Sequence, residues 1–214
     1  MGSLQFHAAA TEGALHSGEV RDAWELKNGT AITLRAVRPD DGEKMQALVR
    51  GLSMQSRYRR FFYPVRELMP AMLARFTDAD PMHAITLLAM IQDKGEQIAV
   101  GMAQYVAEPY PQRCEFAVVV SDAWQRSGIA TRLIRNLICI ARAAGIERFE
   151  GDVLADNEPM RQLLIGMGFT IGPHPDGASL LRAEKELAAP AWKCSELAML
   201  ALRARNRQGA ASFV

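Results

Sequence analysis

The sequence predicts a single mixed α/β domain of the α+β type, in which helices flank a mostly antiparallel central sheet. The chain has 214 residues, 49% apolar and 23% charged, which suits one well-filled globular domain with short appendages. Three extended apolar segments between residues 83 and 120 are separated only by short turns, as in antiparallel hairpins. After them, the spacing of apolar residues changes from strand-like to helical.

The first part of the chain is expected to form one strand and three helices. Residues 1–23 are small and weakly patterned, which is typical of a loosely docked arm. A turn at Asn28 and Gly29 precedes a strand at about 30–37, which ends before Pro39. Capping residues and apolar stripes predict helices at 41–51, at 53–62 and at about 65–76.

The second part alternates between strands and helices. Apolar residues recur at three- and four-residue intervals from 127 to 144, which predicts a helix with one buried face that ends at Gly145. The predicted strands are 83–91, 97–108, 113–120, 146–154, 169–171 and 179–187, with a further helix at 157–168. We expect the domain to span 28–187, between an arm at 1–27 and a tail at 188–214 that has a helical pattern at 191–205.

Charge and cysteine content argue against several classes of function. The formal net charge is +1, so no overall field favours nucleic acid or an anionic membrane. The longest largely apolar run, 84–91, is much shorter than a membrane span, and residues 1–18 do not have the pattern of a signal peptide. Cys114, Cys139 and Cys194 fit neither a disulfide framework nor a zinc site. We therefore expect a cytoplasmic protein with buried thiols, no metal, and no nucleic-acid or membrane partner.

The segment WQRSGIATRLI at 124–134 joins the most strand-like run of the chain to its best amphipathic helix. The first N–H groups of a helix have no internal acceptor and lie at the positive end of the helix dipole. Gly128 and Ala130 have little or no side chain, so an anion can approach the main chain there. The spacing alone leaves two interpretations open: a simple strand-to-helix connection, or a cradle of donors from Gln125 to Thr131 for a phosphate or pyrophosphate.

Several segments, in the same order, are similar to segments of the GNAT acetyltransferase superfamily. Q-x-x-G-x-A at 125–130 resembles its Q/R-x-x-G-x-G/A pyrophosphate loop, and N-x-x-M-x-x-L-L-x-G-x-G-F at 157–169 resembles its second cofactor segment. GTAITLRAVRPDD resembles its opening strand and helix start. LSMQSRYRRFF at 52–62, with EFAVVVSDAWQ at 115–125, further resembles the bacterial protein lysine acetyltransferases of that superfamily.

The resemblance covers roughly 24–187 and implies both a fold and a co-substrate. The strands at 113–120 and 146–154, the fourth and fifth of the predicted domain, would splay apart and hold acetyl-CoA between them. The backbone of Val118 and Val120 would bind the pantetheine as an added strand would. The residues that the resemblance assigns to acetyl-CoA binding are Val118, Val119, Val120, Gln125, Arg126, Ser127, Gly128, Ile129, Ala130, Thr131 and Asn157.

Glu115 is the candidate catalytic base. A free lysine has a pKa of about 10.4 and is almost fully protonated at pH 7, so amine acetylation benefits from a group that removes a proton. Glu115 interrupts an otherwise apolar strand, and the resemblance places the glutamate of the protein lysine acetyltransferases there. The residues alone leave open a solvated strand face or an ion pair with Arg113. Cys114 alternates to the opposite face and needs no catalytic role.

The general acid is less clear than the base. Leu164 stands where many relatives carry a tyrosine that protonates the leaving thiolate. Ser121 and Tyr105 are alternatives, and a CoA thiolate can also leave without a dedicated acid. The resemblance assigns the oxyanion to a backbone N–H of the strand, most plausibly that of Val118.

Four arginines have two interpretations each. Arg126 stands where many relatives have a second loop glycine, and it either adds a cation for the phosphates or points to solvent. Arg57, Arg59 and Arg60 form a dense basic cluster interleaved with aromatic residues. The cluster is either a solvated helix face with buried aromatics, or a contact for the acceptor or for the CoA 3′-phosphate.

The leading hypothesis is an acetyl-CoA-dependent N-acetyltransferase that moves an acetyl group directly to a primary amine, with a protein lysine as the expected acceptor. The sequence leaves open a small-molecule amine or amino acid as acceptor, and also a non-catalytic acyl-CoA-binding or interaction module. Retention of Glu115 together with the complete loop favours an enzyme. Whether the chain forms a dimer also stays open.

Overall fold

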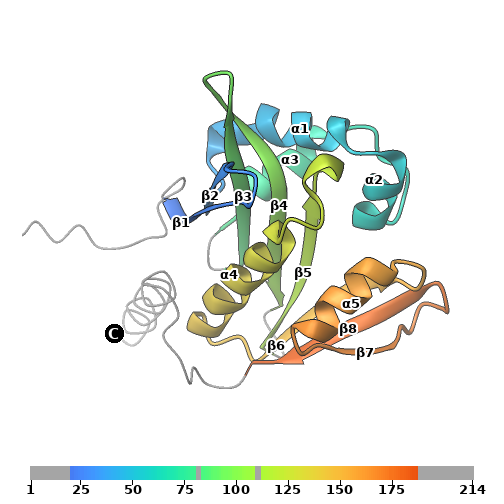
Figure 1. Cartoon of the computed structure of the whole chain (residues 1–214). Helices are drawn as coiled ribbons and strands as arrows, with labels where there is room; N and C mark the ends of the chain where they lie inside the picture. Colours follow the sequence, from blue (N-terminus) through green and yellow to red (C-terminus); the bar gives the residue numbers. More distant parts are fainter. Residues whose placement is uncertain (1–19, 81–82, 109–111, 188–214) are drawn as a thin grey trace, which may run out of the picture.

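The computed structural model describes residues 20–80, 83–108 and 112–187, and in these ranges it shows an eight-stranded sheet with helices on both faces (Figure 1). The strand order is β1-β2-β3-β4-β5-β6-β8-β7. All neighbouring strands are antiparallel except β5 and β6, which are parallel. The predicted fold class is therefore confirmed. The predicted helix at 191–205 and Cys194 lie outside the described residues.

The strands and helices follow the apolar patterns of the sequence closely. The strands are β1 (Val20–Glu25), β2 (Ala31–Ala36), β3 (Ala84–Asp93), β4 (Glu96–Glu108), β5 (Arg113–Val120), β6 (Arg148–Leu154), β7 (Thr170–Pro173) and β8 (Leu180–Glu186). The helices are α1 (Gly42–Gly51), α2 (Met54–Phe61), α3 (Pro70–Thr77), α4 (Ile129–Ala143) and α5 (Glu158–Gly166). Two 3-10 turns, η1 (Pro39–Asp41) and η2 (Asp122–Trp124), precede α1 and the loop before α4.

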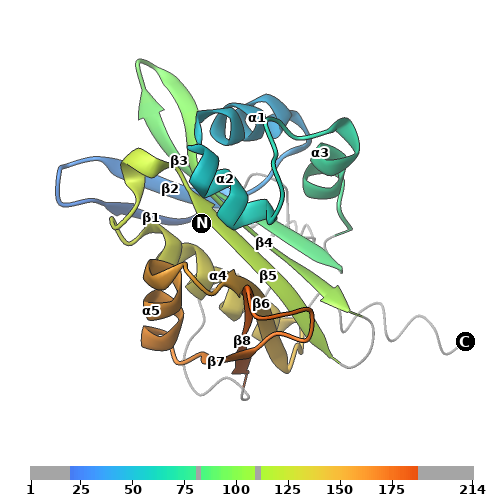
Figure 2. The ribbon, with the colours of Figure 1, turned by 90° about the vertical axis from the view of Figure 1, so that its right-hand side faces the viewer.

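The helices divide the core into two layers, one on each face of the sheet. Figure 2 shows α1, α2 and α3 on one face and α4 on the other, and α1 and α4 both contact the long central strand β4. Gly101 of β4 allows the close approach of α4, because a Cβ there would lie 3.2 Å from the side chains of both Ile129 and Leu133. The start of α4 is thereby fixed against the sheet, next to the end of β5.

Two elements differ from the sequence analysis. The strand β1 lies within the predicted arm and pairs with β2 at the edge of the sheet. Its Asp22 forms an ion pair with Arg132 of α4 at 2.9 Å, and the Arg132 guanidinium lies over the Trp24 ring. The helix predicted at about 65–76 begins only at Pro70, because a proline is accommodated in the first turn of a helix but not in its interior.

The strands β5 and β6 separate along their length. Their parallel ladder covers only three residue pairs and ends at Glu115 and Glu150, although β5 continues to Val120 and β6 to Leu154. The predicted splay is therefore confirmed. Beside the ladder, Phe116 stacks on Phe149 with ring centroids 4.5 Å apart. Gly151 makes room for this stack, because a Cβ there would lie 2.6 Å from the Phe116 ring.

Candidate active site

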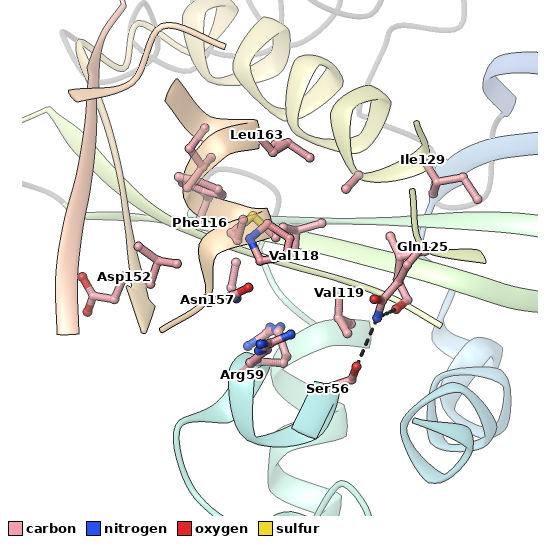
Figure 3. A pocket seen from close by; sticks show the side chains of 18 of the residues that line it. Ser56, Arg59, Phe116, Val118, Val119, Gln125, Ile129, Asp152, Asn157 and Leu163 are labelled. Carbon is pink, nitrogen blue, oxygen red and sulfur yellow. Dashed lines mark hydrogen bonds between the residues drawn. The ribbon is translucent and has the colours of Figure 1, made fainter. Parts of the chain in front are cut away.

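A pocket of about 630 Å³ opens where β5 and β6 splay apart. The residues that line it come from β5, from α2, from the loop before α4, from the end of β6 and from the first turns of α5. Figure 3 shows Gln125 and Asp152 far apart across this pocket, with Arg59 and Asn157 between them. The predicted site residues that line it are Glu115, Val118, Val119, Val120, Gln125, Arg126, Gly128, Ile129, Ala130, Thr131 and Asn157.

The loop before α4 presents backbone donors to the pocket. Arg126 and Gly128 both have positive φ, 59° and 87°, a conformation that costs an arginine energy but not a glycine. Ile129, Ala130 and Thr131 form the first turn of α4, whose N–H groups have no acceptor within the helix. With the positive end of the helix dipole, these groups favour an anion.

Ser127 is the one predicted binding residue that does not line the pocket. Its hydroxyl donates to the carbonyl of Trp124 at 2.5 Å, so the side chain closes the loop on itself. A serine at this position therefore supports the turn, whatever its backbone contributes.

Gln125 connects the loop to α2 rather than pointing freely into the pocket. Its Nε2 donates to the Ser56 hydroxyl at 3.1 Å and to the Val120 carbonyl at 3.2 Å (Figure 3). Asp122 adds a second connection, since its carboxylate accepts hydrogen bonds from the Ser53 N–H, the Ser53 hydroxyl and the Ser56 hydroxyl. Partial burial acts to raise the pKa of Asp122, but these hydrogen bonds outweigh it and lower that pKa. We call this group of four side chains the α2 latch.

The edge of β5 that faces the pocket has no strand partner beyond Glu115. Val118, Val119 and Val120 pair with β4 on the opposite edge only. Backbone N–H and C=O groups on an unpaired edge can bind an extended ligand as an added strand. Asn157 faces the same space from the start of α5, and its side chain takes part in none of the hydrogen bonds among the described residues.

Glu115 lies at the point where β5 and β6 begin to separate, and its exposed side chain lines the pocket. Partial desolvation and the Asp152 carboxylate raise the pKa of Glu115, against the opposing charges of Arg182 and Arg60. The ion pair with Arg113 that the sequence left open does not form, because Arg113 pairs with Glu108 at 2.7 Å. Cys114 is fully buried on the other face, as predicted, and burial raises the pKa of its thiol.

Asp152 is a pocket carboxylate that the sequence analysis missed. Its Oδ1 accepts from Arg182 Nε at 2.6 Å, and its Oδ2 lies 3.2 Å from His174 Nε2. Arg182 also donates to the buried Glu150 at 3.1 Å. The signal in the sequence was the acidic pair Glu150 and Asp152, two residues apart on one strand, a spacing that places both on one face.

The basic cluster of α2 divides into two parts. Arg57 is structural, because its Nη1 donates to the carbonyls of Arg50 at 3.2 Å and Leu52 at 2.6 Å, at the C-terminal end of α1. Arg59 and Arg60 instead line the pocket. The Arg60 guanidinium lies over the Phe61 ring, 4.9 Å from its centroid, and burial lowers its pKa to about 10, so it stays charged at neutral pH.

Of the residues considered as a general acid, neither Tyr105 nor Ser121 reaches the pocket. Leu164, by contrast, is buried and lines the pocket. Tyr105 is buried in the core, and its ring lies edge-on to that of Phe149. Tyr63, which the sequence analysis did not consider, is a half-exposed phenol at the pocket, and its hydroxyl lies 3.5 Å from Met72 Sδ.

The described residues contain neither a cluster of metal ligands nor a membrane-spanning helix. No group of three or more His, Cys, Asp or Glu side chains there is arranged to hold a metal ion. No helix in these ranges has both the length and the apolar character needed to cross a membrane.

Comparisons with known proteins agree with this geometry. Residues 52–169 match the model of the acetyltransferase (GNAT) family. The acetyltransferase PA5475 of Pseudomonas aeruginosa is 31% identical over 160 residues, which cover 74% of this chain and 86% of that protein. The crystal structure of the GNAT domain of S. lividans PAT superposes with a TM-score of 0.69 at 27% identity, covering 78% of this chain and 96% of that domain.

A more distant structure shares the fold alone. The protein yncA of Salmonella typhimurium, solved with its cofactor acetyl-CoA, is 17% identical, with a TM-score of 0.58 over 77% of this chain and 98% of that one. The family match covers more than half of the chain, and it includes α2, β5, the loop before α4 and α5. The chain therefore belongs to the GNAT acetyltransferase family.

Proposed function

We propose that this protein transfers the acetyl group of acetyl-CoA to a primary amine, that Glu115 acts as the base, and that the acceptor is a protein lysine. The observation that carries the proposal is the position of Glu115: a carboxylate with a raised pKa, in the pocket, at the start of the β5–β6 splay. The lysine assignment rests on the resemblance of 52–62 and 115–125 to the protein lysine acetyltransferases.

The residues present fit acetyl-CoA along the whole pocket. The N–H groups from Gly128 to Thr131 would hold the diphosphate, and Arg126 lines the pocket beside them. The free edge of β5 at Val118 and Val120 would hold the pantetheine amides, with Asn157 opposite. When bound, acetyl-CoA supplies the activated acyl group.

Proton removal is the step that needs a side chain. Reaching the neutral amine of a lysine at pH 7 costs about 4–5 kcal/mol, given an ordinary pKa of about 10.4. Glu115 would accept that proton, directly or through one water, and its raised pKa brings it closer to the operating pH of an efficient base. The N–H of Val118 would donate to the thioester oxygen as negative charge develops there. The thiolate can leave unaided, with Tyr63 as a nearby donor.

Two broader features belong to the same proposal. We place the catalytic domain at 28–187, with β1 added from the preceding arm, and the tail proposed at 188–214 lies outside the described residues. A cytoplasmic location is supported by Cys114, a buried thiol outside any disulfide.

The test replaces the carboxylate without changing its shape. We expect Glu115→Gln to bind acetyl-CoA with unchanged affinity by calorimetry, while kcat for a lysine peptide falls about 10²- to 10⁴-fold in a thiol-release assay. Glu147→Gln is the matched control, because Glu147 is exposed and does not line the pocket.

Two results would count against the proposal. Wild-type kcat in Glu115→Gln at every pH would exclude Glu115 as the base. Mass spectrometry of a cell lysate incubated with enzyme and acetyl-CoA identifies the acceptor, and acetylated small amines without acetylated protein would exclude a protein lysine.

A further inference from the structure

The helix α2 runs along the pocket, so its two ends face different parts of the site. Ser56 lies at the loop end, where it receives the hydrogen bond from Gln125. Arg60 lies one turn further, about 6 Å along the helix axis, and its charge acts on Glu115. Glu115 is about 17 Å along β5 from Val120, which the loop end of α2 adjoins through Gln125. The arginines of α2 are therefore nearer to the reacting groups than Ser56 is.

Arg59 and Arg60 face the pocket without a hydrogen-bonded carboxylate. Arg59 is partly buried and takes part in none of the hydrogen bonds or ion pairs among the described residues. The Nε of Arg60 is buried without a hydrogen-bond partner, and its guanidinium contacts the rings of Phe61 and Phe76. In Figure 3, Arg59 lies between Ser56 on one side and Asp152 on the other. Buried or half-buried guanidinium groups normally have an anionic or hydrogen-bonding partner.

The opposite wall of this end is acidic. Glu115 on β5 and Asp152 on β6 both line the pocket, and the two carboxylates are close enough to interact electrostatically. Asp152 is already bound by Arg182, so its charge is partly compensated. Glu115 takes part in no hydrogen bond or ion pair with another described residue. At this end of the pocket, the carboxylates of β5 and β6 therefore favour a cation, and the arginines of α2 favour an anion.

Three kinds of anion could in principle meet the arginine wall, and the geometry favours one. The phosphates of CoA belong to the other end of β5, because the diphosphate is assigned to the start of α4 and the 3′-phosphate is attached to the ribose beyond it. A carboxylate at the end of the acyl chain would extend along β5 toward Glu115, which repels it. An acceptor with a carboxylate near its amine would instead place the ammonium against Glu115 and Asp152 and the carboxylate against Arg59.

We propose that Arg59 is a specificity-determining residue that binds the carboxylate of an acidic side chain adjacent to the acceptor lysine. The inference rests on the proposed function, since it assigns a preference within the same acceptor site. An arginine suits this task, because its planar guanidinium can donate two parallel hydrogen bonds to one carboxylate. The chemistry selects lysines with Asp or Glu beside them over lysines in neutral or basic surroundings.

The experiment compares matched peptides. Each peptide has one lysine. One of the four positions within two residues of that lysine is either Glu or Gln, and kcat/KM is measured by thiol release. We expect wild type to prefer the best Glu peptide about tenfold over its Gln twin, as one charge-assisted hydrogen-bonded pair would give. Arg59→Met should lose most of that preference and still acetylate the Gln peptide. Arg66→Met is the matched control, because Arg66 is exposed, lies outside the pocket and should keep the wild-type preference.

Charge reversal keeps the test decisive if Arg59→Met is poorly folded. Arg59→Glu should prefer a peptide with Arg at the same position over its Glu twin, since arginine supplies the opposite charge without a second acceptor lysine. The inference would be overturned if wild type and Arg59→Met had the same ratio of kcat/KM for the Glu and Gln peptides, or if wild type showed no preference. Neither result would contradict the proposed acetylation of amines. A third result would also overturn the inference: wild type uses succinyl-CoA efficiently, Arg59→Met does not, and neither shows a peptide preference. Arg59 would then bind the acyl chain instead of the acceptor. Failure of wild type to acetylate any amine would instead overturn the proposed function itself.

Discussion

At the scale of single residues, the candidate base is defined by the charges around it. Partial desolvation and Asp152 make the ionised form of Glu115 less stable, and Arg182 and Arg60 make it more stable. The two arginines differ in place: Arg182 is bound to Glu150 and Asp152, whereas Arg60 comes from α2 on the other side of the pocket. A mutation at Arg60 therefore changes the electrostatics of Glu115 without disturbing the Asp152 ion pair.

Arg60→Met should move the acid limb of the pH–rate profile to higher pH. The positive charge of Arg60 lowers the pKa of Glu115, so its removal raises that pKa. A base must be deprotonated to act, so kcat/KM of the variant should fall most at low pH and recover as the pH rises. The measurement is kcat/KM against pH with one saturating and one varied substrate. Loss of activity by the same factor at every pH would show that Arg60 matters only through packing on Phe61 and Phe76.

At the scale of elements, the α2 latch fixes one helix to the phosphate end of the pocket. Ser53 is the N-cap of α2 and accepts a hydrogen bond from the Ser56 N–H, while both hydroxyls donate to Asp122. Asp122 lies in the 3-10 turn between β5 and the loop before α4. The position of α2, and with it that of Arg59 and Arg60, thus depends on residues close to the proposed diphosphate site.

Asp122→Ala should release α2 and impair the site from a distance. Several exposed or partly buried hydrogen bonds are lost, so we expect the free energy of unfolding to fall by about 1–2 kcal/mol. We also expect KM for acetyl-CoA to rise, because the loop loses its connection to the helix. Denaturant unfolding and steady-state kinetics measure the two effects. Asp93→Ala, at an exposed strand end away from the pocket, should change neither. A stable variant with unchanged KM would show that α2 is held by other contacts.

Elements with a strong apolar period were predictable, and those decided by distant contacts were not. The helix α4 follows from its buried stripe, and β3, β4 and β5 follow from apolar runs separated by short turns. The strand β1 contains Asp22 and Trp24, whose partner Arg132 lies more than a hundred residues away, so no local pattern indicated it. The start of α3 was predictable from Pro70, but the apolar spacing before that proline suggested a longer helix.

The same distinction holds within the candidate site. The loop and Glu115 could be found from a local motif and its resemblance to a family. Asp152 was indicated only by its spacing from Glu150 on the same strand. Tyr63 and the division of the arginine cluster had no such signal, because their roles depend on which way α2 faces. The local sequence identified residues whose side chains could act in catalysis or binding. Only the tertiary fold showed which of them line the same pocket.

At the scale of the whole molecule, a buried ion pair joins the first part of the sheet to the helical layer. Arg35 of β2 and Asp41, at the start of α1, are 2% and 0% exposed. Their side chains make two hydrogen bonds, at 2.5 and 2.7 Å, and Asp41 also accepts from the Arg38 N–H at 2.7 Å. Burial acts to raise the pKa of Asp41, but Arg35 and the Arg38 N–H outweigh it and lower that pKa. The pair therefore links ionisation of one carboxyl to stability.

Asp41→Asn should be among the most destabilising substitutions that leave the pocket untouched. It leaves the Arg35 charge buried without compensation, which typically costs about 3–5 kcal/mol, a large part of the usual 5–15 kcal/mol of a domain. Because the folded pKa of Asp41 is lowered, its contribution is complete above the unfolded pKa of an aspartate and disappears as the pH falls through the folded value. The stability difference between wild type and Asp41→Asn should thus be large at pH 7 and shrink in acid.

Denaturant unfolding at neutral and acid pH measures this difference directly. Asp40→Asn, the exposed neighbour in the same turn, is the matched control and should change stability little at either pH. The double variant Arg35→Met/Asp41→Leu removes both charges together, and it should be more stable than Asp41→Asn, because no uncompensated charge remains in the interior. Equal stability of wild type and Asp41→Asn at pH 7 would mean that Arg35 finds another partner or reaches water. The Arg35–Asp41 pair would then not account for a loss of stability in acid.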